Sequence, residues 1–255
     1  MKKLILFVAF LSLLAAFGAA QVYAGNITIF DGQTSGSVGT WTNRGNAPGE
    51  DQEVEPGCVG AQVWDLEAFV LTGKNLSMIG GFNFKDGYGG FDGGDIFVDT
   101  VSGGSNVYGY EYAIKMNIIG TGGSYTVYQL DNNPAFSTVY FSQNNASNPW
   151  QLQSGGTALY TGTLTFTSGL TNAQTGFLGD VNGVPSHYSV ELANLADYLL
   201  TTGALFHYTM ECGNDNLMGL APVPIPPTAL LFGSGLLGVS LLGLRRRQKA
   251  YRGKK

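Results

Sequence analysis

The chain predicts an all-β fold, a β-sandwich of jelly-roll type, and three observations support this class. Apolar and polar residues alternate over several short segments, the period-two pattern of strands with one buried face. Gly-Gly, Asn-Asn-Pro and Ser-Asn-Pro sequences separate these segments and favour turns. Within residues 25–222, only residues 190–200 have a pattern compatible with a turn or two of helix. Residues 25–222 are long enough for one such domain.

Seven segments of this region are predicted as strands, each bounded by turn-forming residues. They are residues 64–72, 76–84, 95–101, 108–119, 124–130, 158–168 and 204–211. After the last of these, Gly213 and the polar residues 214–216 predict a turn, although their amides and carboxylate are also of a kind that binds calcium. The turn is the preferred interpretation of the segment 207–219.

Charge is segregated along the 255 residues, of which 38 are glycine. Residues 25–222 contain all 18 Asp and Glu but only Arg44, Lys74, Lys85 and Lys115, a net charge of −14 for this region. The other nine basic residues lie at the two ends, beside apolar runs. This composition excludes a coiled coil and a basic nucleic-acid-binding protein, and it is typical of a chain that is exported across a membrane.

The N-terminus has the three parts of a secretory signal peptide. Lys2 and Lys3 precede an apolar run that ends near Ala20, and Val22 and Ala24 stand at the positions expected before a cleavage site. We therefore expect residues 1–24 to be removed by signal peptidase. The alternative is an uncleaved signal anchor.

The C-terminus combines a proline motif, an uncharged apolar span and a basic end. Residues 228–244 predict a short transmembrane helix, which at 1.5 Å per residue spans about 25 Å. Basic residues stay on the cytoplasmic side, so residues 245–255 would lie inside and the acidic region outside. The prolines end the helix on the outer side because they lack an amide donor. The motif residues are Val223, Pro224, Ile225, Pro226, Pro227, Arg245, Arg246 and Arg247.

This order of parts resembles the PEP-CTERM sorting signal over residues 223–247. Ile225 replaces the glutamate that gives the signal its name, so the sequence looks like the VPxPP-type variant. The resemblance implies recognition by an exosortase in the inner membrane of a Gram-negative bacterium that makes exopolysaccharide. It also implies that the protein is membrane-anchored before processing and reaches the cell surface or extracellular matrix afterwards. A plain C-terminal anchor is the alternative.

Cys58 and Cys212 are the only cysteines, and in an exported chain one pair most simply forms one disulfide. Closing so long a loop would contribute about 4 to 5 kcal/mol in the chain-entropy model. Two free thiols are the alternative. A zinc site is excluded because the two cysteines, His187 and His207 have no ligand spacing.

A glycine-rich stretch, residues 86–99, is the candidate metal site. Asp86, Asp92, Asp95 and Asp99 stand among five glycines, and flexible glycine loops let carboxylates converge on calcium. The spacing is neither an EF-hand nor a repeated β-helix motif. The alternative interpretation is a Gly-Gly turn that leads into a strand with solvent-facing acids. No other cofactor is expected.

The sequence contains no GxSxG or HExxH motif, so an enzyme, such as a glycan hydrolase, is the least favoured class. A carbohydrate-binding module is the alternative function, because aromatic rings stack on the apolar faces of sugars. Trp41 and Trp150 are the candidate ligand-binding residues, and Trp64 is a further tryptophan. The preferred function is that of a non-catalytic structural or adhesive protein associated with exopolysaccharide.

Overall fold

The computed structural model describes residues 25–26, 62–100, 106–177, 184–201 and 203–221. The chain divides into two compact units, Met1–Pro222 and Val223–Lys255, and all described residues belong to the first unit. The signal peptide and the sorting tail predicted above lie outside the described residues. Among the residues that are described, no helix has the length and apolar character needed to cross a bilayer.

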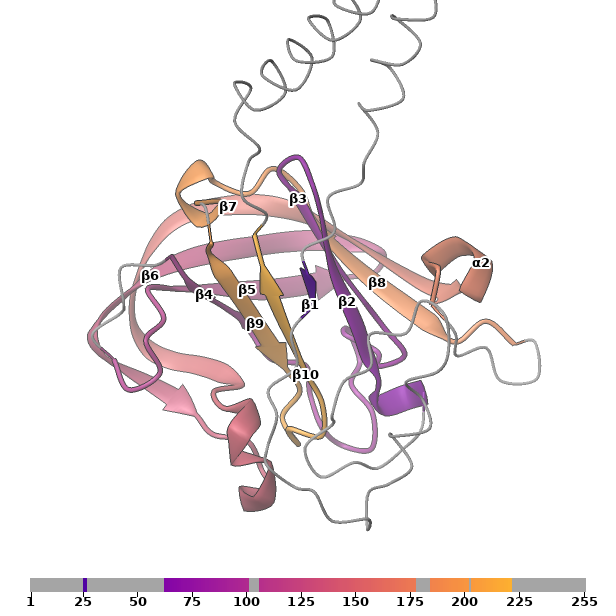
Figure 1. Ribbon diagram of the computed structural model, residues 1–255, viewed down its shortest axis with the longest axis horizontal. Helices are drawn as coiled ribbons and strands as arrows, with labels where there is room; N and C mark the ends of the chain where they lie inside the picture. The colour runs from indigo at the N-terminus through magenta and orange to yellow at the C-terminus, as the bar shows by residue number, and fades with distance from the viewer. Residues whose placement is uncertain (1–24, 27–61, 101–105, 178–183, 202, 222–255) are drawn as a thin grey trace, which may run out of the picture. The chain divides into compact units, whose positions relative to one another are not determined.

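The described residues form one antiparallel sheet with the strand order β1-β10-β9-β4-β5-β6-β7-β8-β3-β2 (Figure 1). The strands are β1 (Gly25–Asn26), β2 (Leu66–Thr72), β3 (Asn75–Gly80), β4 (Ile96–Asp99), β5 (Tyr112–Ile119), β6 (Gly122–Ser137), β7 (Gln151–Leu170), β8 (His187–Leu192), β9 (Leu205–Thr209) and β10 (Asn216–Leu220). Four short helices connect them: η3 (Gln62–Trp64), η4 (Ser142–Ser147), α2 (Asn172–Thr175) and η5 (Asp197–Leu199).

The sheet is rolled until its two ends nearly meet, because β10 and β1 at one end of the strand order contact β2 at the other. Across this seam, a Cβ on Gly219 of β10 would lie 2.9 Å from the Phe69 ring of β2, so only glycine allows so close an approach. The Leu66 backbone N–H at the start of β2 donates to Asp215 Oδ2 at 2.7 Å, just before β10. A buried carboxylate thus joins the two ends of the sheet.

The main core lies inside the roll, and the strands supply it from alternate positions. Leu164 and Phe166 of β7 and Val190 and Leu192 of β8 point inward, whereas Glu191 between them is exposed. Burying one such side chain contributes about 1.5 to 3 kcal/mol, so this alternation drives the rolling of the sheet.

A second apolar cluster lies on the outer face of β4 and β5, around Phe97, Tyr110, Ala113 and Leu152. The long β6–β7 hairpin has register shifts near Leu130 and Ala135. Such irregularities bend strands, and the ring of Phe136 lies 5.6 Å from that of Phe97. The far part of the hairpin therefore covers the outside of the roll.

The all-β class is confirmed, and all seven predicted strands correspond to strands of the sheet. The described strands form one continuous sheet, not the two separate sheets of the predicted jelly-roll sandwich. The physical reason is the length of β6 and β7, which have 16 and 20 residues. Because these strands bend, one end of each belongs to the roll and the other end covers the outer face of the roll.

Three strands were not predicted: the two-residue β1, β8 and β10. Residues 190–200, which were compatible with a turn or two of helix, contain the end of β8 at Leu192 and the single helical turn η5. In β10, the polar Asn216 is buried together with Leu217, so the strand lacks the alternation that would have revealed it.

Candidate functional site

The glycine-rich stretch positions aromatic rings rather than carboxylates. Tyr88 and Phe91 pair across a two-residue loop, in which Gly89 and Gly90 have φ values of 63° and 88°. Positive φ at both positions is the type I′ geometry, which strongly favours Gly-Gly. The turn places the Tyr88 ring 5.0 Å and the Phe91 ring 6.2 Å from the ring of Trp64.

The four acids of this stretch do not come together. Asp86 lies beside Lys85 and Asn83, and Asp99 ends β4. The backbone N–H of Asp92 donates to the Glu211 carboxylate, and the backbone N–H of Glu211 donates to the Asp92 carbonyl. Asp95 is buried and accepts from the Leu152 N–H at 2.8 Å, with Lys115 Nζ at 3.9 Å. Burial raises the pKa of Asp95 to about 6, against the opposing effects of the Leu152 hydrogen bond and Lys115.

Within the described ranges, no three His, Cys, Asp or Glu side chains are arranged to hold a metal ion. The proposed calcium ligands are thus separated by the fold, and calcium binding stays a prediction from composition alone. The alternative interpretation, a Gly-Gly turn leading into a strand with solvent-facing acids, describes the backbone of the stretch better, but it is wrong for Asp95, which is buried.

Five aromatic side chains form a continuous aromatic cluster that is partly open to solvent. The short helix η3 before β2 supplies Trp64, and the loop after β3 supplies Tyr88 and Phe91. The β6–β7 connection supplies Tyr140 and Phe141. The Phe91 ring lies 5.5 Å from that of Tyr140 and 5.6 Å from that of Phe141. Tyr140 is 69% exposed, Tyr88 49% and Phe141 37%. Such exposure of large rings marks a candidate binding surface.

Beside this cluster is a cavity of about 350 Å³, which we call the aromatic pocket. Three rings of the cluster line it, those of Trp64, Phe91 and Phe141. The other lining residues are uncharged: Gln143, Asn144, Cys212 and Asn214.

Asn144 is the polar group of greatest interest in this pocket. It is 2% exposed, and its Nδ2 donates to the Cys212 carbonyl at 2.8 Å, which fixes the orientation of the amide. Its Oδ1 accepts no hydrogen bond from any described residue. The atom itself is closed to solvent, and because a buried acceptor without a donor is costly, a donor that reached it would be favoured.

Hydrogen bonds tie together two of the connections that form the pocket, β6–β7 and β9–β10. The Tyr140 N–H donates to the Glu211 carbonyl at 2.8 Å, and Ser147 Oγ donates to the Gly213 carbonyl at 3.0 Å. Gly213 has a φ of 66° in the β9–β10 turn, and a Cβ there would lie 2.7 Å from Val139. Glycine is therefore required at Gly213 for both conformation and space.

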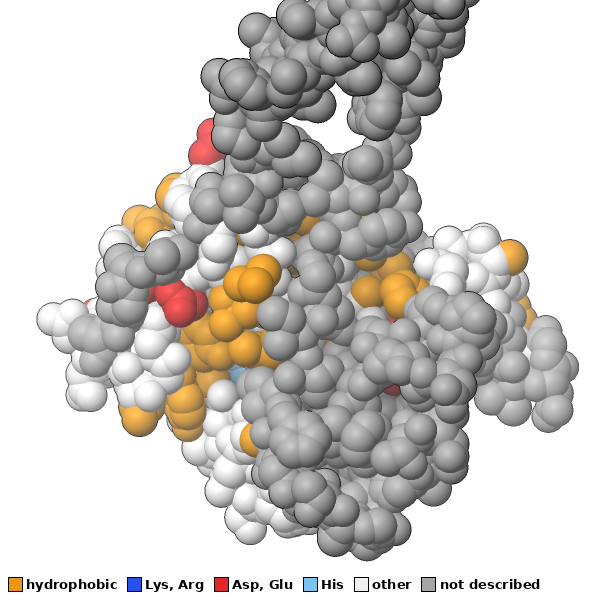
Figure 2. All heavy atoms as spheres, viewed as in Figure 1, with side chains coloured by type: hydrophobic (Ala, Val, Ile, Leu, Met, Phe, Trp, Pro, Cys, Tyr) orange, Lys and Arg blue, Asp and Glu red, His pale blue; other side chains and the backbone are white. Residues whose placement is uncertain are grey.

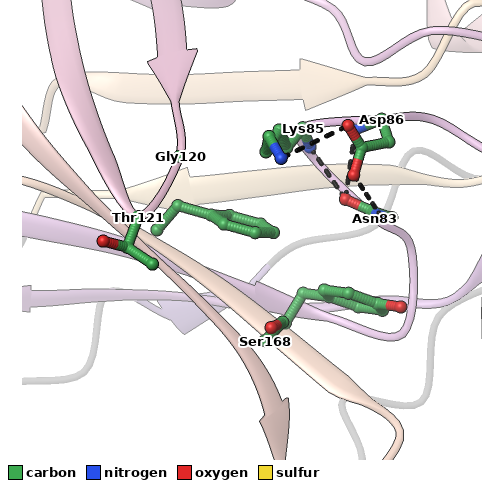
Figure 3. A pocket seen from close by; sticks show the side chains of 8 residues that line it. Asn83, Lys85, Asp86, Gly120, Thr121 and Ser168 are labelled. Carbon is green, nitrogen blue, oxygen red and sulfur yellow. Dashed lines mark hydrogen bonds and ion pairs between the residues drawn. The ribbon is translucent and has the colours of Figure 1, made fainter.

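A second cavity, of about 420 Å³, opens at another part of the described unit, and we call it the polar cavity (Figure 3). Its lining residues come from the β3–β4 loop, the β5–β6 turn, β7 and β8. They are Asn83, Lys85, Asp86, Gly120, Thr121, Phe166, Ser168 and Tyr188.

The polar side chains on one wall of the polar cavity already interact with one another. Lys85 Nζ lies 3.5 Å from Asp86 Oδ1, and Asn83 Nδ2 donates to Asp86 Oδ2 at 3.3 Å. Asn83 Oδ1 accepts the backbone N–H groups of Lys85 and Asp86, both at 3.1 Å. The Phe166 and Tyr188 rings stack at 6.1 Å. This wall is a closed local network.

Cys212, one partner of the predicted Cys58–Cys212 disulfide, is a free thiol in the structure. Cys58 lies outside the described residues. Cys212 is 2% exposed, and burial raises the pKa of its thiol to about 11, against opposing backbone hydrogen bonds. The thiol is therefore neutral and weakly nucleophilic at physiological pH.

Trp150, one of the two predicted ligand-binding tryptophans, lines neither cavity. Trp41 lies outside the described residues. Trp150 is 9% exposed and its carbonyl accepts the Asp95 N–H at 2.8 Å, so it serves to join β7 to β4. Trp64, which stands in the segment predicted as a strand, is the tryptophan that lines a pocket.

The segment 207–219 forms β9, the following turn and β10. His207 is fully buried against the rings of Tyr110 and Phe97, whose centroids lie 5.6 Å and 6.2 Å from its own. Burial lowers the pKa of His207 to about 3, which keeps it neutral at physiological pH. In the turn, Asp215 Oδ1 accepts the Asn216 N–H while its Oδ2 accepts that of Leu66. The predicted turn is confirmed, and the Asp215 carboxylate in it accepts two backbone N–H groups.

Reasoning from sequence missed Phe91, Phe141 and Asn144. A signal was present for Phe91, since the Gly-Gly pair between two aromatic residues is a hairpin pattern. No sequence signal connects Asn144 with Trp64. No protein family, no curated protein and no solved structure matches this chain.

Proposed function

We propose that the chain is an exported, non-catalytic protein that an exosortase sorts to the cell surface or extracellular matrix, where it has a structural or adhesive role in association with exopolysaccharide. The observation that carries this proposal is the order of parts at the C-terminus. A proline motif, an uncharged span and three consecutive arginines follow a region of net charge −14. That order provides the orientation and the extended segment that a membrane peptidase needs.

The charge distribution of the folded region supports this proposal. Figure 2 shows acidic side chains but no lysine or arginine among the described atoms of the face in view. Each described lysine lies within 4 Å of a carboxylate, at 2.6 Å for Lys74, 3.5 Å for Lys85 and 3.9 Å for Lys115. Such a surface favours dispersion in water and disfavours direct binding to polyanions such as nucleic acid.

Cell fractionation of a tail variant tests the sorting. In a Gram-negative host with an exosortase, we expect the parent chain to be processed and leave the inner membrane. Replacement of Arg245, Arg246 and Arg247 by glutamine should leave precursor in that membrane, and replacement of Lys254 and Lys255 serves as the control. Equal processing of parent and arginine variant would contradict the proposal, as would full-length chain in the cytosol.

A carbohydrate-binding module is the second candidate, and a specific observation favours it. The exposed aromatic cluster lies beside a pocket with amide side chains, which is the combination that sugar recognition uses. Retention of the full-length chain on immobilised polysaccharide, lost on mutation of the cluster, is the test.

A further inference from the structure

We propose that the aromatic pocket binds a neutral saccharide, with the rings of Trp64, Phe91 and Phe141 against the sugar's apolar face and Asn144 Oδ1 accepting a sugar hydroxyl. This inference rests on the second candidate function, carbohydrate binding, and is independent of the proposed sorting, because saccharide binding by the folded chain does not depend on how the chain reaches the surface.

The shape and lining of the pocket suit a small ligand with one apolar face. Its volume of about 350 Å³ lies within the range of about 300 to 1,000 Å³ that small-molecule sites occupy. Three rings from three different segments surround it, and Tyr88 and Tyr140 extend the aromatic surface beyond its rim. A chain of several sugar units would contact both the pocket and these outer rings.

Asn144 distinguishes a sugar from a purely apolar ligand. Its amide is held by the Cys212 carbonyl, so Oδ1 and not Nδ2 is the atom that remains for a ligand. A hydroxyl group would supply the missing donor, whereas a lipid chain or an apolar side chain would leave Oδ1 unpaired. Gln143, which is exposed at the same pocket, adds an amide that both donates and accepts.

The electrostatics specify an uncharged sugar. No Lys, Arg, Asp or Glu lines the pocket, and the raised pKa of Cys212 keeps its thiol neutral. A uronic acid or sulfated sugar would lose water from its charge without gaining a partner. The surrounding region is also acidic, which repels anionic chains.

The polar cavity is the weaker candidate, because its charged wall is satisfied internally. Asp86 already has both Asn83 and Lys85 as partners, and a sugar would have to replace these interactions. The aromatic pocket requires no such exchange at Asn144 Oδ1.

Titration calorimetry on the full-length chain tests the inference with four probes: cellohexaose, mannohexaose and N-acetylchitohexaose as neutral chains, and a hexamer of alginate as the anionic chain. We expect at least one neutral chain to bind and the alginate not to bind. Phe141→Ala should weaken binding about tenfold, the size of effect of one well-placed aromatic contact. Leu159→Ala, which removes a side chain 48% exposed outside the pocket, should bind as the parent does.

Phe141 is chosen because it is partly exposed, so the variant should keep the parent's melting temperature. Asn144→Asp is a second variant. It keeps an acceptor oxygen, but it loses the Nδ2 group that donates to the Cys212 carbonyl and adds a negative charge, so it should bind more weakly than the parent. Binding of no neutral chain, equal binding of alginate, or unchanged binding by Phe141→Ala would each overturn the inference. So would binding of the apolar probe N-phenyl-1-naphthylamine alone, which would make the pocket a docking site for apolar groups. None of these results alters the fractionation test of sorting.

Discussion

The aromatic pocket and the polar cavity have similar volumes, about 350 Å³ and about 420 Å³, but the polar groups that line them are in different states. In the polar cavity, Asn83, Lys85 and Asp86 satisfy one another. In the aromatic pocket, Asn144 has an acceptor without a described donor, beside rings that are open to solvent. The two cavities are therefore similar in volume but differ in whether their polar groups have hydrogen-bond partners.

The two regions also differ in how they are built. The Lys85–Asp86–Asn83 wall uses residues that are close in sequence, whereas the aromatic pocket joins residues near positions 64, 91, 141 and 212. A wall of local contacts tolerates change more readily than a site at the junction of several distant segments.

The largest expected effect is that of a methyl group in the turn under the aromatic pocket. Gly213→Ala should lower the free energy of unfolding by about 4 kcal/mol, because it adds strain at positive φ to a clash with Val139. Gly120→Ala at the polar cavity is the matched control, since Gly120 has a φ of 60° but open space around its Cβ position. It should cost about 1 to 2 kcal/mol. Urea unfolding measures the free energy of unfolding of both variants, and equal losses would contradict the expected difference between Gly213 and Gly120.

The next effect is a pH dependence that arises at Asp95, which ties the hairpin carrying Phe141 to β4 through the Leu152 N–H. The pKa of Asp95 is raised from 3.8 to about 6 in the folded state, so the folded state favours the protonated form. This stabilisation is complete below the unfolded pKa and is lost as the pH rises through about 6. The loss between pH 4 and pH 7 is about 2 kcal/mol.

Asp95→Asn should remove that part of the pH dependence, and Asp86→Asn in the exposed loop should keep it. Urea unfolding at pH 4, 5, 6 and 7 provides the measurement. A parent protein that becomes more stable relative to Asp95→Asn as the pH rises from 4 to 7 would have the wrong sign for this assignment.

A third effect concerns the thiol in the wall of the aromatic pocket. At pH 8, a pKa of about 11 instead of an ordinary value near 9 reduces the thiolate fraction about a hundredfold. Iodoacetamide should therefore react with native Cys212 at least about a hundredfold more slowly than with an unperturbed thiol. In denaturant without reductant, both cysteines should react. Protection of both cysteines under those conditions would restore the disulfide expected from sequence.

The smallest effect is expected in the wall of the polar cavity. Lys85→Ala removes an ion pair between side chains that are 31% and 62% exposed, and it should change the free energy of unfolding by less than about 0.5 kcal/mol. Lys74→Ala, which removes the exposed pair with Asp197, is the control of the same type. A loss above about 2 kcal/mol in Lys85→Ala alone would show that this wall is structural rather than a local network.

Local pattern predicted much of the fold and little of the candidate site. Alternation identified β5 and β7 because each has one buried face. It did not identify β10, where Asn216 and Leu217 are both buried, nor did it show that the bent hairpin would cover Phe97. The glycines of residues 86–99 indicated a turn correctly, but their neighbours Tyr88 and Phe91, not the acids, are brought together with Trp64.

The sequence by itself determined the strand-rich class, the turns that need glycine and the segregation of charge, since each depends on residues that are neighbours in the chain. Only the tertiary structure decided that the strands form one rolled sheet, that Asp215 joins its ends and that Asn144 lies in a pocket with Trp64. These features depend on contacts between distant segments, and the register and curvature of the sheet determine which distant segments meet.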